Sequence, residues 1–376
     1  MTNIQILKEK TVLVRSNSVD TVTFNIEMGC DESQPDEKEA PKTIVAPTKT
    51  TSMIRSANFS KPDCTVIFIG PGFSGKTTLI RHLKMLYLGG FSDQERRVIR
   101  NSIRISIIQL LKGTIQRIDP QLYSGDDDLY ESAEYIAECI EDHVGDELNE
   151  SSAFHINRLW KSPILNSLMR EHIIKTFGEN DCYLLDSIDR ISMIDYIPSD
   201  EDIIKVRIMT IGTHENKLYL GEKKSVIYDM GGQLSERKNW KMYYPKAHCI
   251  VITLPLSDFD LHLFEDDTKL RFDDSLSIFE SIWSIPDINT KKVLIVLNKE
   301  DIFLEKIWKN QSGFRDAYNF SGEMNEKNCL EAAVRFFKSK IPDMSPKYPV
   351  NIITTCAMNP GSVTHLFEEL ATIVQS

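Results

Sequence analysis

Short apolar runs recur through most of the chain, and each is followed by a loop rich in polar residues. Five runs have the uninterrupted apolar character of buried parallel strands. They are TVIFIG (65–70), SVIYDMGG (225–232), CIVITLPLSD (249–258), VLIVLNKED (293–301) and VNIITTCA (350–357). Helical patterns lie between or after them at 268–283, 326–340 and 362–374. This alternation predicts an α/β fold with a doubly wound, mostly parallel sheet, whose ligands bind where the strands end.

One long block interrupts this pattern and follows the helical period throughout. Ser92 and Glu95 predict a capping box, and a long helix follows over 93–118. Its apolar residues recur at helical spacing: Val98, Ile99, Ile103, Ile107, Leu110, Leu111 and Ile115. We predict that 91–204 is an all-helical domain inserted into an α/β domain made of 62–90 and 205–376.

Residues 1–61 show neither period, and prolines at 35, 41 and 47 predict a largely disordered N-terminal arm.

The net charge of −11 argues against a nucleic-acid-binding surface. The seven cysteines are scattered singly, which predicts reduced thiols in a cytosolic protein rather than disulfides or a zinc site. No apolar run approaches the ~18 residues of a membrane span, and the N-terminus lacks a secretory pattern.

The first strand-like run leads into GPGFSGKT (70–77), which matches the phosphate-binding pattern G-x-x-x-x-G-K-[ST] in the required context between a strand and a helix. Backbone N–H groups of such a loop surround phosphate oxygens at a helix N-terminus. Lys76 offers a positive charge to the β- and γ-phosphates, and the Thr77 hydroxyl suits Mg²⁺. An ordinary glycine turn is the alternative. The predicted phosphate-binding residues are Gly70, Gly72, Phe73, Ser74, Gly75, Lys76, Thr77 and Thr78.

The loop NKED (298–301) indicates which base is bound. Asp301 can accept two parallel hydrogen bonds from the N1 and exocyclic amino hydrogens of guanine, a match that adenine cannot offer. Asn298 can brace the loop, the Lys299 stem can cover the ring, and Ala357 can offer its N–H to guanine O6. The predicted guanine-binding residues are Asn298, Lys299, Asp301, Cys356 and Ala357. Asp301 therefore disfavours an ATP-using kinase or ATPase.

DMGGQ (229–233) forms the third loop. Asp229 can hold Mg²⁺ through water, and Gly232 lets its N–H approach the γ-phosphate because no side chain intervenes. Gln233 can orient an attacking water. A Gly-Gly turn with a solvated glutamine is the alternative.

Together with the inserted helical block, these loops resemble the alpha subunit of heterotrimeric G proteins over about residues 62–374. The segments that carry the resemblance are FSDQERRVIRNSI (91–103), DRISMIDYIPSDEDIIKVRIMTIGTHE (189–215), DMGGQLSERKNW (229–240) and LPLSDFDLHLFEDD (254–267). The resemblance implies a Ras-like GTPase domain, Arg207 as a built-in arginine finger, and Thr210 as a Mg²⁺ ligand when the γ-phosphate is present. Arg207 and Gln233 are then the catalytic residues.

The resemblance further implies a signalling switch that binds GTP and GDP, hydrolyses GTP slowly and requires Mg²⁺. Its implied partners are a beta-gamma dimer, a receptor or other exchange factor, regulators of G-protein signalling and a downstream effector. The implied location is the cytoplasm, at the inner face of the plasma membrane.

Three positions depart from the family pattern. Phe73 stands where the family has a Glu that pairs with the finger arginine, Leu234 replaces an Arg, and Ile211 replaces a Thr. A GTP-binding scaffold that does not turn over therefore stays open as an alternative. So does a GTPase not coupled to a seven-helix receptor, since the last helix ends at Ser376, before the family's usual tail. Capture of a beta-gamma dimer through an N-terminal helix is also left open, because the arm prolines forbid a long helix there.

MGCDES (28–33) resembles the start of many chains of this family, in which the Gly is myristoylated and the Cys palmitoylated. A product that begins at Met28 would expose Gly29 for myristoylation and carry palmitate on Cys30. A chain that begins at Met1 leaves Gly29 internal, and only Cys30 can then be acylated. Two acyl groups are needed for stable membrane residence.

Overall fold

The computed structural model describes residues 53–138, 148–176, 179–263, 266, 268–343 and 346–376. The chain divides into two compact units, 1–45 and 46–376, and every described residue lies in the second. The predicted N-terminal arm and the MGCDES segment therefore lie mainly or wholly outside the described residues. No helix among the described residues combines the length and apolar character that crossing a membrane requires.

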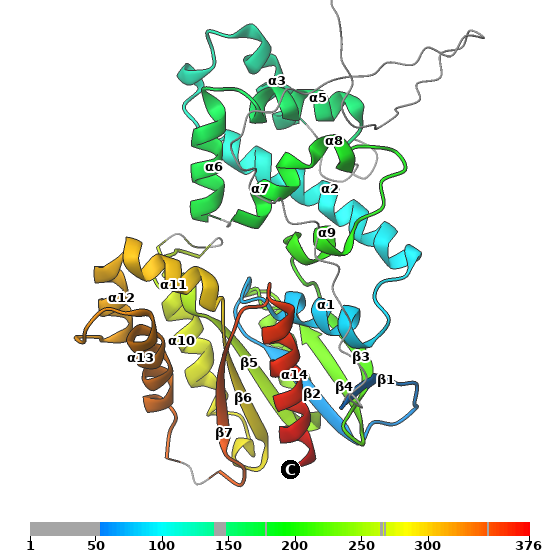
Figure 1. Cartoon of the computed structure of the whole chain (residues 1–376), viewed down its shortest axis with the longest axis vertical. Helices are drawn as coiled ribbons and strands as arrows, with labels where there is room; N and C mark the ends of the chain where they lie inside the picture. The colour runs from blue at the N-terminus through cyan, green and yellow to red at the C-terminus, as the bar shows by residue number, and fades with distance from the viewer. Residues whose placement is uncertain (1–52, 139–147, 177–178, 264–265, 267, 344–345) are drawn as a thin grey trace, which may run out of the picture. The chain divides into compact units, whose positions relative to one another are not determined.

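The described residues form a seven-stranded sheet with the order β1-β3-β4-β2-β5-β6-β7 (Figure 1). The strands are β1 (Ile54–Ser56), β2 (Cys64–Ile69), β3 (Thr213–Leu220), β4 (Lys223–Met230), β5 (Cys249–Pro255), β6 (Lys292–Asn298) and β7 (Val350–Thr355). The five strands from β4 to β7 in this order pair in parallel, whereas β1 and β3 pair antiparallel at one edge. The predicted doubly wound, mostly parallel sheet is confirmed.

Helices cover both faces of the sheet, which is why the central strands are apolar without alternation. All residues of β2, β5 and β6 are buried. The helices are α1 (Lys76–Tyr87) and α14 (Pro360–Gln375) on one face, and α10 (Arg271–Ile282), α11 (Glu300–Lys309), α12 (Gln311–Tyr318) and α13 (Glu326–Ser339) on the other. The same strands thus contribute alternate side chains to two separate hydrophobic cores.

Every secondary-structure element that the structure describes between α1 and β3 is a helix. Its helices are α2 (Asp93–Ile115), α3 (Asp127–Glu138), α5 (Glu150–Trp160), α6 (Leu165–Thr176), α7 (Glu179–Asp186), α8 (Ile188–Ile191) and α9 (Asp200–Lys205). They pack around a third core that includes Ile107, Leu111 and Trp160. The capping box predicted at the start of α2 is present, with Ser92 Oγ accepting from the Glu95 N–H.

Short 3-10 helices occur at η1 (Pro120–Leu122), η3 (Arg237–Met242), η4 (Tyr244–Lys246), η5 (Leu256–Asp258) and η6 (Ile288–Thr290).

The sequence pattern did not predict the two antiparallel strands. β1 lies inside the segment 1–61 predicted to be disordered, so the prediction is wrong at this end. Ile54 is buried there, and the strand pairs with β3 from Ile54 to Ser56. The three residues of β1 are too few to show a period, and β3, between β1 and β4, consists mainly of polar residues.

Candidate nucleotide-binding site

The loop between β2 and α1 encloses a buried cation. Lys76 Nζ donates to Gly70 O at 3.0 Å and to Pro71 O at 2.8 Å, and only 4% of the residue is exposed. Burial lowers the pKa of Lys76 to about 8, although the nearby Asp229 opposes this shift. A cation held by uncharged carbonyls in this way favours an anionic ligand, because burial of an unpaired charge is costly.

Glycine is required at the end of this loop. Gly75 has φ of +96°, and a Cβ there would lie 2.1 Å from the Asn298 side-chain nitrogen. Gly232, from the loop after β4, approaches the same region, and a Cβ there would lie 2.5 Å from Lys76 Nζ. The two glycines thus let the phosphate loop approach the guanine loop and the loop after β4 more closely than a side chain at either position would allow.

Two hydroxyls and a carboxylate meet beside α1. Thr77 Oγ1 lies 2.5 Å from Thr210 Oγ1, and the Thr77 side chain also hydrogen-bonds to Asp229. Burial raises the pKa of Asp229, and its Oδ1 atom has no hydrogen-bond partner among the described residues. No cluster of three or more His, Cys, Asp or Glu suited to a metal occurs in the described part of the chain. One carboxylate with hydroxyls fits Mg²⁺, which keeps waters and takes further oxygens from phosphates.

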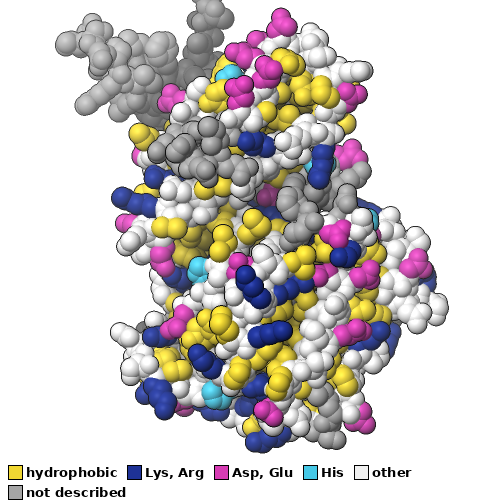
Figure 2. Space-filling model, turned by 180° about the vertical axis from the view of Figure 1, so that it is seen from behind, with side chains coloured by type: hydrophobic (Ala, Val, Ile, Leu, Met, Phe, Trp, Pro, Cys, Tyr) yellow, Lys and Arg dark blue, Asp and Glu magenta, His cyan; other side chains and the backbone are white. Residues whose placement is uncertain are grey.

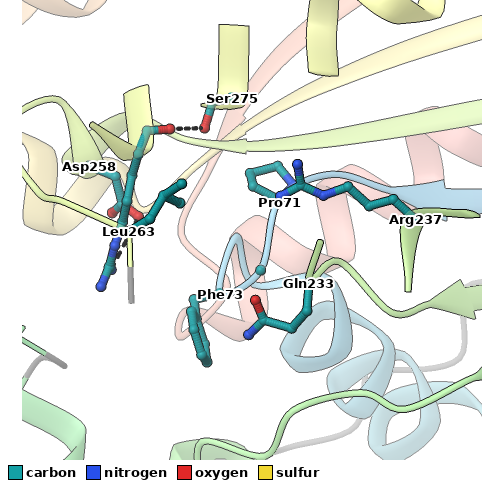
Figure 3. Close-up of a pocket in the computed structure, with 9 residues that line it drawn as sticks. Pro71, Phe73, Gln233, Arg237, Asp258, Leu263 and Ser275 are labelled. Carbon is teal, nitrogen blue, oxygen red and sulfur yellow. Dashed lines mark hydrogen bonds and ion pairs between the residues drawn. The ribbon is translucent and has the colours of Figure 1, made fainter. Parts of the chain in front are cut away.

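The loop after β4 is fixed by one arginine. Arg237 donates from both terminal nitrogens to the Asp274 carboxylate, at 2.7 and 2.6 Å, and from Nε to Gly232 O at 2.9 Å. Figure 3 shows the Gln233 amide on the same side of the phosphate loop as the Phe73 ring, and a Cβ on Gly72 would lie 2.5 Å from Gln233 Oε1. Gln233 is therefore placed against the loop that would hold the phosphates.

Arg207 lies over the ring of Phe73, with its guanidinium carbon 3.5 Å from the ring centroid. Phe73 itself sits at φ of +62°, a conformation unusual for a residue other than glycine. The stacking is a cation–π contact, which uses the ring face instead of a carboxylate. An acidic group is nevertheless near. Burial raises the pKa of Asp181, on α7, to about 6, and the positive charge of Arg207 opposes that shift. The ring face of Phe73 thus takes the place of the Glu that the family pattern has at this position.

Two contacts hold the backbone that carries Arg207. Arg81 Nη1, on α1, donates to Ile203 O and Val206 O, each at 2.8 Å. Ser106 Oγ, on α2, donates to Arg207 O at 2.8 Å. Arg81 is buried, and burial lowers its pKa to about 10 while Asp229 opposes this shift. The helix after the phosphate loop is thereby bonded directly to the segment that carries the finger arginine.

The guanine loop is braced as predicted. Asn298 Nδ2 donates to Ser74 O at 2.7 Å, and Asn298 Oδ1 accepts from the Ala357 N–H at 3.0 Å. This one side chain thus joins the phosphate loop, the end of β6 and the end of β7. The Ala357 N–H is directed to Asn298 here, so its bond to guanine O6 stays a prediction.

The remaining guanine-loop residues gather at the same edge. Lys299 Nζ donates to Asp258 Oδ1 at 3.0 Å, and Arg271 Nη1 lies 3.7 Å from the other carboxylate oxygen. Burial would raise the pKa of Asp258, but Lys299 and Arg271 outweigh burial and lower it. The Cys356 thiol hydrogen-bonds to Asp301, and burial followed by the Asp301 charge raises the pKa of Cys356 to about 11.

Sequence comparisons agree with this geometry. Residues 41–374 match the family described as G-protein alpha subunit. A guanine nucleotide-binding protein alpha-2 subunit of Dictyostelium discoideum is 29% identical over 325 residues, covering 82% of this chain and 87% of that protein. A guanine nucleotide-binding protein alpha-3 subunit of Ustilago hordei is 30% identical over 288 residues, covering 75% of this chain and 80% of that protein. An alpha-2 subunit of Caenorhabditis elegans is 27% identical over 318 residues, covering 83% and 88%.

The chain belongs to the G-protein alpha subunit family. It is therefore a guanine-nucleotide-binding signal transducer, which confirms the family and the general function predicted from the sequence. In this alpha subunit the predicted phosphate, guanine, metal and catalytic residues all lie at or just after the carboxyl ends of β2, β4, β6 and β7, including the first turns of α1 and α11, or on the segment between α9 and β3. Gly29 and Cys30 lie outside the described residues.

Sequence reasoning missed several residues of this alpha subunit's site: Arg81, Asp181, Arg237, Asp258, Arg271 and Asp274. A signal existed for two of them. Asp258 follows an apolar strand directly, and Arg81 interrupts the apolar stretch of α1 between Ile80 and Leu83. The others are recognised only by contacts between segments that are distant in the sequence.

Proposed function

We propose that this alpha subunit hydrolyses GTP to GDP and phosphate, with Arg207 and Gln233 acting on the transition state. Gln233 orients the attacking water, whose oxygen forms a bond to the γ-phosphorus as the bond to the β-γ bridging oxygen breaks. The Arg207 guanidinium neutralises the charge that grows on the phosphate oxygens during this transfer.

The same residues also bind and orient the nucleotide. Lys76 and the backbone N–H groups of 70–78 hold the phosphates, and Asp301 selects guanine. Thr77, Thr210 and, through water, Asp229 would hold Mg²⁺, which when bound neutralises charge on the phosphate oxygens. Thr210 leaves this set when the γ-phosphate departs, so the segment that carries it reports the state of the nucleotide.

One observation supports this proposal most strongly. Thr77 and Thr210 are 133 residues apart in the sequence, yet their hydroxyl oxygens lie 2.5 Å apart beside Asp229. The segment from 206 to 210 carries both Thr210 and Arg207. The same arrangement that completes a Mg²⁺ site therefore brings the finger arginine to the phosphate loop.

Single-turnover release of phosphate from GTP and from ATP at equal concentration tests the proposal. We expect release from GTP and none above background from ATP. Release from ATP at a similar rate would contradict the assignment of Asp301. Tight GTP binding without phosphate release would favour a second function, a GTP-binding scaffold, which the stacking of Arg207 on Phe73 makes worth testing.

We further propose that the GTP-bound form recruits an effector through its exposed apolar side chains. Ile211, Leu234 and Met242 are 75%, 47% and 63% exposed, and the first two lie on the segments nearest the predicted γ-phosphate. A receptor or other exchange factor, a beta-gamma dimer and regulators of G-protein signalling are the other proposed partners. A pull-down with a GTP-loaded Gln233→Leu variant, with Leu234→Arg as its control, tests the effector surface.

We also propose a location at the inner face of the plasma membrane, through acylation of Gly29 and Cys30 in a product that begins at Met28. Mass spectrometry of the native N-terminus tests this. Chains that begin only at Met1 and carry unmodified Cys30 in the soluble fraction would contradict it.

A further inference from the structure

A second pocket lies at the end of the sheet opposite to the nucleotide site, where β2, β5 and β6 begin. It has a volume of about 690 Å³, which is in the range of small-ligand sites. Six basic residues line it: Lys61, Lys223, Lys246, His248, Lys291 and Lys292. We refer to it as the basal pocket. Figure 2 shows Lys and Arg side chains gathered over the lower part of one face, the end at which these strands begin.

The positive charge of the basal pocket is not neutralised by the fold. None of its five lysines forms an ion pair with another described residue, and Asp63 is the one acidic residue among those lining it. The Asp63 carboxylate accepts from the Lys224 N–H at 3.1 Å. Burial and then the charge of Lys223 lower the pKa of Lys292. Like charges collected in one pocket of a protein with a net charge of −11 indicate a site for an anion.

Two of the lysines have a structural role. Lys223 Nζ donates to Val374 O at 2.6 Å, and Lys292 Nζ donates to Ile373 O at 2.6 Å and Val374 O at 3.0 Å. They bond to the last carbonyls of α14, where cations are favourable. A test of ligand binding should therefore leave both of them unchanged.

The other basic groups remain available to a ligand. Lys61 and Lys246 are exposed, and their ammonium groups bond to no described residue. Lys291 Nζ uses one of its three hydrogens, on Ala247 O at 2.9 Å. His248 Nδ1 accepts from the Thr65 N–H at 3.1 Å, so the neutral ring carries its proton on Nε2 and can donate from it.

We propose that the basal pocket binds a compact anion with several phosphate groups, such as an inositol polyphosphate, either free or as the headgroup of a phosphoinositide. Lysine ammonium groups bind phosphate as point charges, whereas planar carboxylates are matched best by arginine. No arginine is present among the described residues that line the pocket. Its volume accommodates one ring with its phosphates and not an extended acidic peptide.

The test uses the full chain loaded with GDP and Mg²⁺, so that the phosphate loop is already occupied. Binding of inositol hexakisphosphate is measured by calorimetry. Binding to phosphatidylcholine vesicles that contain a phosphoinositide bisphosphate is measured by co-sedimentation, with phosphatidylserine vesicles of equal total charge as the reference. The pocket variant combines Lys61→Gln, Lys246→Gln and Lys291→Gln. The control combines Lys309→Gln, Lys327→Gln and Lys338→Gln, which are exposed and outside the pocket.

Each basic residue near an anionic surface strengthens binding about fivefold, so we expect the pocket variant to bind about 100-fold more weakly and the control about as well as the parent. Binding only to the free anion, or only to phosphoinositide vesicles, would show whether the ligand is soluble or a lipid headgroup. Either result would support the proposal. No binding of either, an equal loss in the control, or binding of polyglutamate alone would overturn the proposal. If the triple variant does not fold, Lys61→Glu alone must still weaken binding, since that side chain bonds to no described residue. GTP hydrolysis should be unchanged in every variant.

Discussion

The guanine side and the γ-phosphate side of the nucleotide site are built in different ways. On the guanine side, Asn298 joins three loops through two short hydrogen bonds, and Asp301 and Cys356 are already in contact. These residues follow directly from the ends of β6 and β7. The guanine side is thus set by short contiguous motifs on rigid strands.

The γ-phosphate side depends on contacts between distant segments. Arg207 is stacked on Phe73, and its segment is held by Arg81 on α1 and by Ser106 on α2. No single motif contains these residues. The contrast indicates that the predicted guanine-binding residues are held by neighbouring loops alone, whereas the predicted catalytic arginine is also held by a helix of the inserted block.

The largest effect expected on the guanine side comes from Asp301→Asn. Loss of the paired acceptors should weaken GDP binding by about 100-fold or more, since hydrogen bonds to a charged group contribute about 1.5–3 kcal/mol each. Calorimetry with GDP measures this. Cys356→Ser is the control, because it keeps a donor beside Asp301. Unchanged GDP affinity in Asp301→Asn would show that the base is recognised elsewhere.

Asp202 tests whether the helical block supports the finger arginine. Its buried carboxylate accepts from Arg190 at 2.7 and 2.8 Å and from the Tyr196 hydroxyl at 2.9 Å, at the start of the helix that leads to Arg207. Asp202→Asn should lower the free energy of unfolding by about 1–3 kcal/mol, because the half-exposed Arg190 and the Tyr196 hydroxyl lose a charged acceptor. Chemical denaturation measures this free energy. The control is Glu201→Gln, which breaks a surface ion pair with Lys205 and should lower the free energy of unfolding by less than about 0.5 kcal/mol.

The same carboxylate predicts a pH dependence. Burial would raise the pKa of Asp202, but bonds from Arg190, Ser199 and Tyr196 outweigh burial and lower it to about 2. A folded pKa below the ordinary aspartate value of 3.8 means that the stabilisation is full above about pH 4. It is lost as the pH falls through about 2. A difference between parent and Asp202→Asn that persists unchanged to pH 2 would contradict this.

Replacing Arg81 should slow GTP hydrolysis more than it weakens nucleotide binding. Arg81→Met removes the bonds to Ile203 O and Val206 O, so the segment with Arg207 loses its link to α1. We expect hydrolysis to slow by about tenfold, or ~1.4 kcal/mol, with the affinity for a non-hydrolysable GTP analogue changed little. Arg81→Lys keeps one donor and the charge, so its rate of hydrolysis should lie between those of the parent and Arg81→Met. An equal loss of binding and hydrolysis would assign Arg81 to the phosphate loop instead.

Of these substitutions, Phe73→Glu should have the smallest effect, a change in the rate of spontaneous GDP release. A charge pair with Arg207 contributes about 1–3 kcal/mol when partly buried, and the cation–π stack about 0.5–2 kcal/mol. Spontaneous GDP release should therefore be a few-fold slower in Phe73→Glu than in the parent. Release of a fluorescent GDP analogue measures this, with Phe73→Leu as the uncharged control. Release from the parent that is equal to or slower than from Phe73→Glu would refute the expectation.

Most of the fold was predictable because buried parallel strands and amphipathic helices leave strong patterns. β2, β5 and β6 are apolar throughout, and the capping box at Ser92 marks the start of α2. β1 was missed because it has only three residues, and β3 was missed because most of its residues are polar. The contacts that hold the segment of Arg207 could not be predicted for a different reason: Arg81 and Ser106 lie more than 100 residues earlier in the chain than the atoms they bond, and no local pattern encodes such contacts.

Single-turnover hydrolysis by Arg207→Ala and Gln233→Leu tests the central claim most directly. Both side chains act mainly on the transition state, so each variant should hydrolyse GTP at least about tenfold more slowly than the parent, on the ~1.4 kcal/mol scale. GTP binding should change little in either. Hydrolysis by either variant at the parent rate would contradict the assignment of the catalytic site.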